Sequence, residues 1–156
     1  MSGLRFVVQE HHARRLHYDF RLEVDGILAS WAIPKGPSMN PKDKHLAVRV
    51  EDHPLRYRLF EGVIPKGEYG AGSVIVWDEG RYALAEGDDP RREIARGKIV
   101  FSLSGKKLRG LFTLVKMHGS RYGANSWLLI KDRDEFADAA WSIGEHLGSV
   151  RTTIAS

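Results

Sequence analysis

The sequence has 156 residues, with 24 lysines and arginines against 20 aspartates and glutamates, a pI near 9.4 and no cysteine. This length suits one domain, and the lack of cysteine excludes disulfides, thiolate metal sites and a cysteine nucleophile. The small basic excess permits a polyanionic partner without requiring one. The N-terminal stretch "MSGLRFVVQEHHARR" lacks the apolar core of a signal peptide. Since no run of about 18 apolar residues occurs either, we expect a cytoplasmic protein with no membrane association.

Short alternating segments bounded by turn residues run through most of the chain. They predict eight strands, at residues 17–24, 27–33, 45–52, 72–78, 81–87, 97–105, 108–117 and 125–132. Asp25-Gly26, Glu79-Gly80 and residues 104–107 each separate two of these segments, and such positions are typical of hairpin turns. Closure of many short strands removes exposed sheet edges. The expected fold is therefore mainly β, a closed or nearly closed antiparallel barrel.

One or two short helices are expected at the periphery of this barrel. The segment "DPRREIARG" offers Asp89 as a cap and Pro90 at the first helical position, and residues 134–147 form the second candidate. We expect a single domain over residues 1–156, with a core at about 5–135 and a C-terminal helix and tail at 134–156.

Residues 16–24 alternate strictly, and their polar half is unusual. His17, Asp19 and Arg21 fall on one side of an extended chain, where side chains two apart share a face. Imidazole and carboxylate ligands at this spacing can converge on one metal ion, and the arginine beside them can hold an anion. The alternative is an ordinary solvated strand face.

The hairpin register gives this interpretation some support. Counting outward from Asp25-Gly26 pairs Arg21 with Ser30 and Asp19 with Ala32. These small partners leave space beside the polar row, whereas a filled core would need bulk there.

Other histidines are candidates for the same site. A turn after residue 12 can bring His11 or His12 back as a third ligand, although each is also a plausible exposed histidine. His53 precedes Pro54 at a strand end, with Tyr57 close behind. Near a metal-bound phosphate, His53 can act as a general acid or a hydrogen-bond donor.

Three long blocks carry a resemblance to a known family: "FVVQEHHARRLHYDFRLEVDGILASWAIPKGPS", "LAVRVEDHPLRYRLFEGVIPKGEYGAGSVIVWD" and "SWLLIKDRD". Over residues 5–135 the chain resembles the 3′-phosphoesterase domain of bacterial DNA ligase D, of which stand-alone versions occur. The resemblance implies a β-barrel enzyme that removes a 3′-terminal ribonucleoside to leave a 3′-phosphate. It then hydrolyses that phosphate to a 3′-OH, for repair by non-homologous end joining. The implied cofactor is a divalent metal, typically Mn²⁺, with Zn²⁺, Co²⁺ or Fe²⁺ as alternatives.

The resemblance also implies roles for particular residues. The metal ligands would be His11, His17 and Asp19. The catalytic and phosphate-binding groups would be Arg21, His53, Tyr57 and Lys35. Where the family often has a phosphate-binding arginine, this sequence has His45, so either His45 acts as a weaker donor or Arg49 or Arg56 takes the anion.

The implied partners are DNA or primer-template 3′ ends, together with the ligase, polymerase and Ku of an end-joining system, near the nucleoid. Met1 lies just before the first matching block, which favours a stand-alone protein over an excised domain.

Two other functions remain open from the sequence. His17, Asp19 and His53 can be interpreted as the facial triad of a non-haem iron oxygenase. The second alternative is a non-catalytic basic barrel that binds nucleic-acid ends, with steep salt dependence and no metal requirement.

Overall fold

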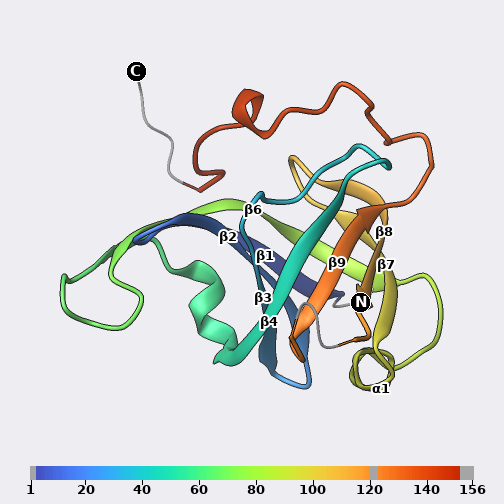
Figure 1. The fold of residues 1–156 in the computed structure, drawn as a ribbon, viewed down its shortest axis with the longest axis horizontal. Coiled ribbons are helices and arrows are strands. Elements are labelled where there is room, and N and C mark those ends of the chain that lie inside the picture. The colour runs from blue at the N-terminus through green and yellow to red at the C-terminus, as the bar shows by residue number, and fades with distance from the viewer. Residues whose placement is uncertain (1–2, 120–122, 152–156) are drawn as a thin grey trace.

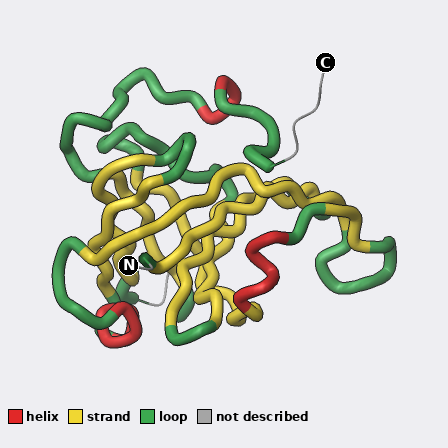
Figure 2. The backbone as a smooth tube through the Cα atoms, turned by 180° about the vertical axis from the view of Figure 1, so that it is seen from behind, coloured by secondary structure: helices red, strands yellow, loops and turns green. Residues whose placement is uncertain are grey.

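The structure, a computed structural model, describes residues 3–119 and 123–151. Its strands form one antiparallel sheet, with the short helical segments at the periphery (Figures 1 and 2). The strands are β1 (Leu4–His12), β2 (Leu16–Val24), β3 (Ile27–Ile33), β4 (Lys44–Pro54), β5 (Gly62–Ile64), β6 (Gly72–Leu84), β7 (Lys98–Ser104), β8 (Arg109–Lys116) and β9 (Ser126–Lys131). The helical segments are the 3₁₀ helix η1 (Leu55–Leu59), the α-helix α1 (Pro90–Ala95) and the 3₁₀ turn η3 (Ile143–Glu145).

The sheet closes on itself. The strand order is β1-β2-β3-β4-β9-β8-β7-β6, and β6 pairs back with β1. The short β5 pairs with the start of β6, outside this ring. The predicted closed antiparallel barrel is confirmed. In the described part of the chain, no helix has the length and hydrophobicity needed to cross a membrane.

The β2–β3 hairpin has the predicted register. Its turn residues Asp25 and Gly26 have φ angles of 50° and 82°, the left-handed conformation that a two-residue hairpin turn requires. Arg21 pairs with Ser30 and Asp19 with Ala32, as counted from the turn. The apolar half of β2 faces the barrel interior, where it joins a continuous core. That core includes Phe6, Phe20, Leu22, Trp31, Trp77, Phe101 and Phe112.

The predicted hairpin at Glu79-Gly80 is wrong, because β6 runs through this point as one strand from Gly72 to Leu84. Gly80 does not mark a turn. It allows the backbone at Ser104 to approach closely, because a Cβ at residue 80 would lie 2.1 Å from the carbonyl oxygen of Ser104. The strand instead contains a bulge around Trp77, at which its register with β1 shifts. The eight predicted strands therefore included two halves of β6, and both β1 and β5 were missed.

The predicted helix near the C-terminus is also wrong. Residues 134–147 are irregular apart from η3, whereas α1 forms as expected, with Asp89 accepting a hydrogen bond from the Arg91 backbone. The side chains of Asp134 and Asp138 accept hydrogen bonds from backbone N–H groups two residues ahead. Such local bonds compete with a helix. The segment then crosses one end of the barrel, where Trp77 donates a hydrogen bond to the His146 carbonyl.

Candidate metal and phosphate site

A group of polar side chains lies on the outer face of the β1–β2 hairpin. His11 and His17 are direct cross-strand partners, and Gln9 is the partner of Asp19. One ligand atom from each of His11, His17 and Asp19 lies within 4.8 Å of the other two. The predicted turn after residue 12 thus returns His11, and not His12, to the polar row. These three residues form a group that can hold a metal ion.

Backbone carbonyls determine which ring nitrogens face the centre of this group. His11 places its Nε2 2.7 Å from the carbonyl oxygen of Gly70, and His17 places its Nδ1 3.2 Å from that of Arg15. When these nitrogens donate their hydrogens, the other nitrogen of each ring presents a lone pair toward Asp19. The His11 Nδ1 and His17 Nε2 atoms are 3.5 and 3.2 Å from its carboxylate oxygens. Such carbonyl partners are typical of metal-ligating histidines.

Electrostatics in this group favour a positive charge at its centre. Burial favours the neutral form of the Asp19 carboxyl, but the two histidines and a neighbouring guanidinium outweigh it and hold its pKa well below the usual range. The hydrogen bond with Asp19 in turn raises the pKa of His17. The imidazole lone pairs of His11 and His17 and the Asp19 carboxylate repel one another unless a proton or a metal cation lies between them. A donor set of two nitrogens and one carboxylate fits Mn²⁺, Fe²⁺, Co²⁺ or Zn²⁺.

Arg21 lies next to Asp19 and is only 3% exposed. Its Nε donates to the side chain of Gln9 at 2.6 Å and its Nη1 to that of Ser30 at 2.8 Å. Its Nη2 is 3.5 Å from an Asp19 oxygen. Ser30, expected only to leave space, is therefore a hydrogen-bond acceptor. The guanidinium is held rigidly, and its Nη2 hydrogens face the metal-ligand group.

His53 and Tyr57 complete this side of the site. The His53 Nδ1 is 3.1 Å from Arg21 Nη1 and 3.2 Å from the Glu51 carbonyl oxygen. Nδ1 thus lies between a donor, the Arg21 guanidinium, and an acceptor, the Glu51 carbonyl oxygen. When it accepts from Arg21, the ring hydrogen is on Nε2. Burial and the charge of Arg21 lower the pKa of His53. Its ring also packs against Tyr57, with the two centroids 4.8 Å apart.

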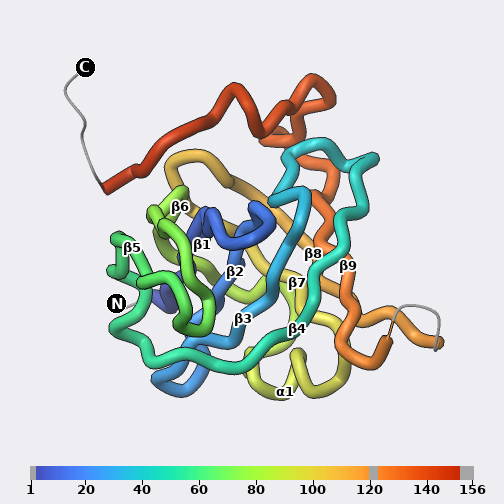
Figure 3. The backbone as a smooth tube through the Cα atoms, turned by 60° about the vertical axis from the view of Figure 1, so that its left-hand side comes forward, coloured from blue at the N-terminus to red at the C-terminus, as the bar shows by residue number. Residues whose placement is uncertain are grey.

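These side chains line a cavity of about 330 Å³ on the barrel wall, which we call the wall cavity. Residues 55–71, which we call the roof segment, pass over it, and Figure 3 turns this side of the barrel forward. Ala32, predicted to leave space, lines the cavity, as do Val50 and Ile64. An arginine, three imidazoles and a carboxylate thus line one small cavity, a combination that can hold a metal ion and an anion beside it.

Comparison with known proteins agrees with this geometry. Residues 9–116 match the family described as the DNA ligase D 3′-phosphoesterase domain. The chain belongs to this family. It is 53% identical over 131 residues to the multifunctional non-homologous end joining protein LigD of Pseudomonas aeruginosa. It is 49% identical over 136 residues to the LigD protein of Mycobacterium tuberculosis, and 44% over 137 residues to that of Mycolicibacterium smegmatis.

These alignments cover 84–86% of the present chain but only 15–17% of each relative. The chain therefore spans less than a fifth of the curated relatives it matches. The predicted resemblance to the phosphoesterase domain is confirmed. The match covers this one domain and not the rest of the longer relatives.

The oxygenase interpretation loses its proposed ligand. In the described residues, the third member of the metal-ligand group is His11 and not His53. His53 lies beside Arg21 instead, with its Nδ1 3.1 Å from the Arg21 Nη1. Membership of the phosphoesterase domain family also argues against that chemistry.

Several predicted residues lie outside the wall cavity. Lys35 is exposed in the turn after β3, and His45 bonds the Gly36 carbonyl oxygen through its Nδ1 at 2.7 Å. Neither residue lines the cavity. Their role in phosphate binding stays a prediction, and it would apply to phosphates of a substrate that lie outside the cavity. The candidate replacements also lie elsewhere, because Arg49 and Arg56 line other cavities.

Two features of the candidate site were missed from the sequence. Gln9, fully buried, accepts from Arg21 and donates to the carbonyl oxygens of Tyr57 and Phe60. The signal was present: Gln9 and His11 are two apart and share a face once residues 4–12 are recognised as a strand. The carbonyl of Gly70 could not be found from side-chain patterns at all.

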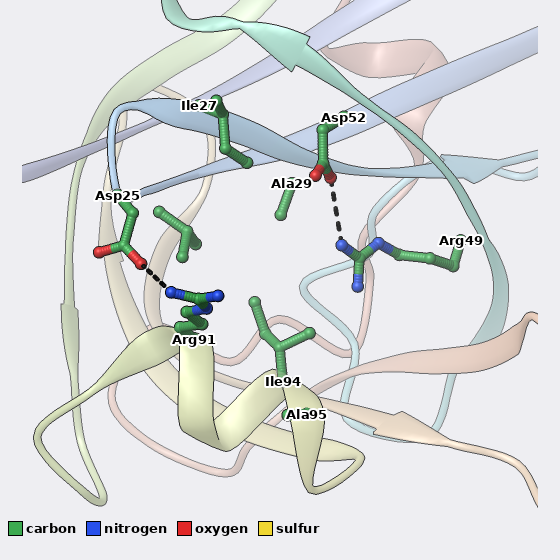
Figure 4. Close-up of a pocket in the computed structure, with 9 residues that line it drawn as sticks. Asp25, Ile27, Ala29, Arg49, Asp52, Arg91, Ile94 and Ala95 are labelled. Atoms are coloured by element: carbon green, nitrogen blue, oxygen red, sulfur yellow. Dashed lines mark hydrogen bonds and ion pairs between the residues drawn. The ribbon is translucent and has the colours of Figure 1, made fainter.

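A second and larger cavity, of about 480 Å³, lies at the mouth of the barrel between α1 and the β2–β3 hairpin. We call it the mouth cavity. The guanidinium groups of Arg49 and Arg91 enter it from opposite walls, each toward its own carboxylate (Figure 4). The nearest atoms are 3.2 Å apart for Arg49 and Asp52 and 3.6 Å apart for Arg91 and Asp25.

Proposed function

We propose that this chain is a metal-dependent phosphoesterase that repairs the 3′ ends of DNA. In the first reaction, water cleaves the phosphodiester before a 3′-terminal ribonucleoside, which releases the ribonucleoside and leaves a 3′-phosphate. In the second, water cleaves that phosphomonoester to give a 3′-OH and inorganic phosphate. The observation that carries the proposal is the placement of Arg21 3.5 Å from Asp19, a member of the metal-ligand group.

His11, His17 and Asp19 would hold the metal ion, for which Mn²⁺ is our first candidate. A divalent cation bound there supplies Lewis-acid polarisation of a phosphoryl oxygen. The chain itself keeps the ligands in position, because Gly70 and Arg15 orient the two imidazole rings through their carbonyl groups.

Arg21 would bind the same phosphate from the side. Its Nε and Nη1 are occupied by Gln9 and Ser30, so the Nη2 hydrogens are the donors that face a substrate. A charge held in place by buried hydrogen bonds needs no rearrangement as negative charge grows on the phosphoryl group. This is the role that we assign to Arg21 in both reactions.

His53 and Tyr57 would act on the phosphate from beside Arg21. In the tautomer in which Nδ1 accepts from Arg21, the Nε2–H of His53 is available to donate to a phosphate oxygen. Tyr57, whose ring lies 5.1 Å from the Arg21 guanidinium carbon, limits the movement of both groups.

In a cell, we propose that the chain prepares ends for non-homologous end joining, together with a DNA ligase, a polymerase and Ku. The support is the name of its relatives, which are described as multifunctional end-joining proteins.

One experiment tests the activity. A labelled primer-template ending in a ribonucleotide, and a second one ending in a 3′-phosphate, are incubated with Mn²⁺, Co²⁺, Zn²⁺, Mg²⁺ or a chelator, and the products are separated on a denaturing gel. We expect both substrates to reach a 3′-OH end with Mn²⁺, and the first to pass through a 3′-phosphate. His17→Ala should abolish both reactions, and Arg91→Ala, in the mouth cavity, should leave them unchanged. Tight, salt-sensitive binding without any product would support the non-catalytic alternative instead.

A further inference from the structure

Tyr69 is a large aromatic residue at the edge of the wall cavity that is 90% exposed. Two other residues of the roof segment, Val63 and Leu59, are also exposed, by 75% and 46%. Val63 and Leu59 line other cavities, so of these three exposed side chains Tyr69 is the one that borders the wall cavity.

The roof segment is tied to the metal-ligand strand at two places. Gly70, the residue after Tyr69, accepts the hydrogen bond from His11, and Gln9 on the same strand bonds the carbonyls of Tyr57 and Phe60. Two backbone hydrogen bonds also order the loop itself, from Glu68 to the Pro65 carbonyl and from Ala71 to the Glu68 carbonyl. The backbone at Tyr69 is therefore held at a fixed place relative to the metal-ligand group.

Basic side chains occur on two segments that border the same cavity, one of which also carries the exposed Glu68. Lys66 is exposed in the roof loop, and Arg14 and Arg15 are exposed in the β1–β2 turn, directly after the cavity-lining Ala13. An exposed ring with basic side chains around it is the combination that binds nucleic-acid strands, because every base has a face that can stack on an aromatic side chain.

We propose that Tyr69 is a platform on which the nucleobase next to the reacting phosphate stacks. This inference rests on the proposed function and adds to it a binding site for the base. Because stacking ignores base identity, the site accepts any terminal nucleotide that carries a base. Because the ring touches the base and not the phosphoryl group, it contributes equally to ground state and transition state. Its loss therefore raises KM and leaves kcat unchanged.

The test compares Tyr69→Ala and Tyr69→Phe with the wild type on two 3′-phosphate oligonucleotides, one normal and one with an abasic terminal nucleotide. On the normal substrate, Tyr69→Ala should raise KM roughly tenfold, and Tyr69→Phe should stay near wild type. The abasic substrate should raise the KM of the wild type by a similar factor but cause no further rise in Tyr69→Ala, since the two changes remove one interaction. Leu147→Ala is the matched control, because Leu147 is 71% exposed and does not line the cavity.

A binding measurement without metal gives a second readout. The fluorescence of 2-aminopurine placed at the terminal position should be quenched by the wild type and Tyr69→Phe but not by Tyr69→Ala. Equal quenching by Tyr69→Ala, or an unchanged KM for this variant on the normal substrate, would overturn the stacking proposal while the enzyme remains active. A wild-type protein without phosphoesterase activity would instead overturn the proposed function.

Discussion

The wall cavity and the mouth cavity contain the same kinds of charged group in different arrangements. In the mouth cavity each arginine faces one aspartate, and all four side chains are at least partly exposed. In the wall cavity one buried aspartate contacts two histidines and one arginine. The larger cavity is thus the one in which opposite charges are already matched in pairs. Convergence of ligands on one carboxylate, and not cavity size, makes the wall cavity the candidate functional site.

The largest difference in kcat/KM should appear when one aspartate in each cavity is replaced by asparagine. Asp19→Asn should lower kcat/KM at least about 1,000-fold, because loss of the metal removes several kcal/mol of transition-state stabilisation. Asp52→Asn should change it less than about twofold, since an exposed ion pair has a small effect. Steady-state kinetics on a 3′-phosphate oligonucleotide measure both. Similar losses in the two variants would show that the cavities do not differ in function.

The arginines provide a second matched pair. Arg21→Lys should lower kcat/KM about 100-fold, because an ammonium group cannot reproduce the fixed contacts to Gln9 and Ser30 while facing a phosphate. Arg49→Lys should leave kcat/KM within about twofold of wild type, although the contact of its guanidinium with the Trp31 ring will be weakened. Full activity of Arg21→Lys would mean that a single positive charge suffices at this position.

The stability of the metal-free protein should depend on pH through Asp19. The folded state lowers the pKa of this carboxyl, so its contribution is present above the unfolded value of about 3.9 and is lost as the pH falls below it. At pH 7, Asp19→Asn should reduce the free energy of unfolding by about 2 kcal/mol, and this difference should shrink toward pH 2. Urea titrations in the presence of a chelator measure it. A difference that is independent of pH would contradict the ion-pair account.

The smallest effect is expected in the mouth cavity. Arg91 is 79% exposed on its side chain and meets Asp25 only at 3.6 Å. Arg91→Ala should change the free energy of unfolding by less than about 0.5 kcal/mol, with no change in activity. Thermal melts and the gel assay check this. A large loss of either property would assign the mouth cavity a role that its geometry does not indicate.

The part of the site on β2 was predictable because it is local. A two-residue turn determines the pairing of β2 with β3, so the positions of Asp19 and Arg21 relative to Ala32 and Ser30 follow by counting.

The parts of the site and fold that were not predicted depend on contacts between segments that are distant in the sequence. β1 has the sequence LRFVVQEHH, in which apolar and polar residues fall in blocks and do not alternate, and so the place of Gln9 beside Arg21 was not predicted. Glu79-Gly80 has the composition of a turn, but its glycine is required by the Ser104 carbonyl of another strand. Similarly, the roof carbonyl of Gly70 approaches His11 across 59 positions of the sequence.

The central claim is that His11, His17 and Asp19 bind one divalent cation, and crystals grown with Mn²⁺ test it most directly. Anomalous diffraction should show one strong peak about 2.0–2.2 Å from the His11 Nδ1, the His17 Nε2 and an Asp19 oxygen. A Mn²⁺ peak at the mouth-cavity carboxylates alone, or imidazole rings turned outward with no shared ion, would contradict the claim.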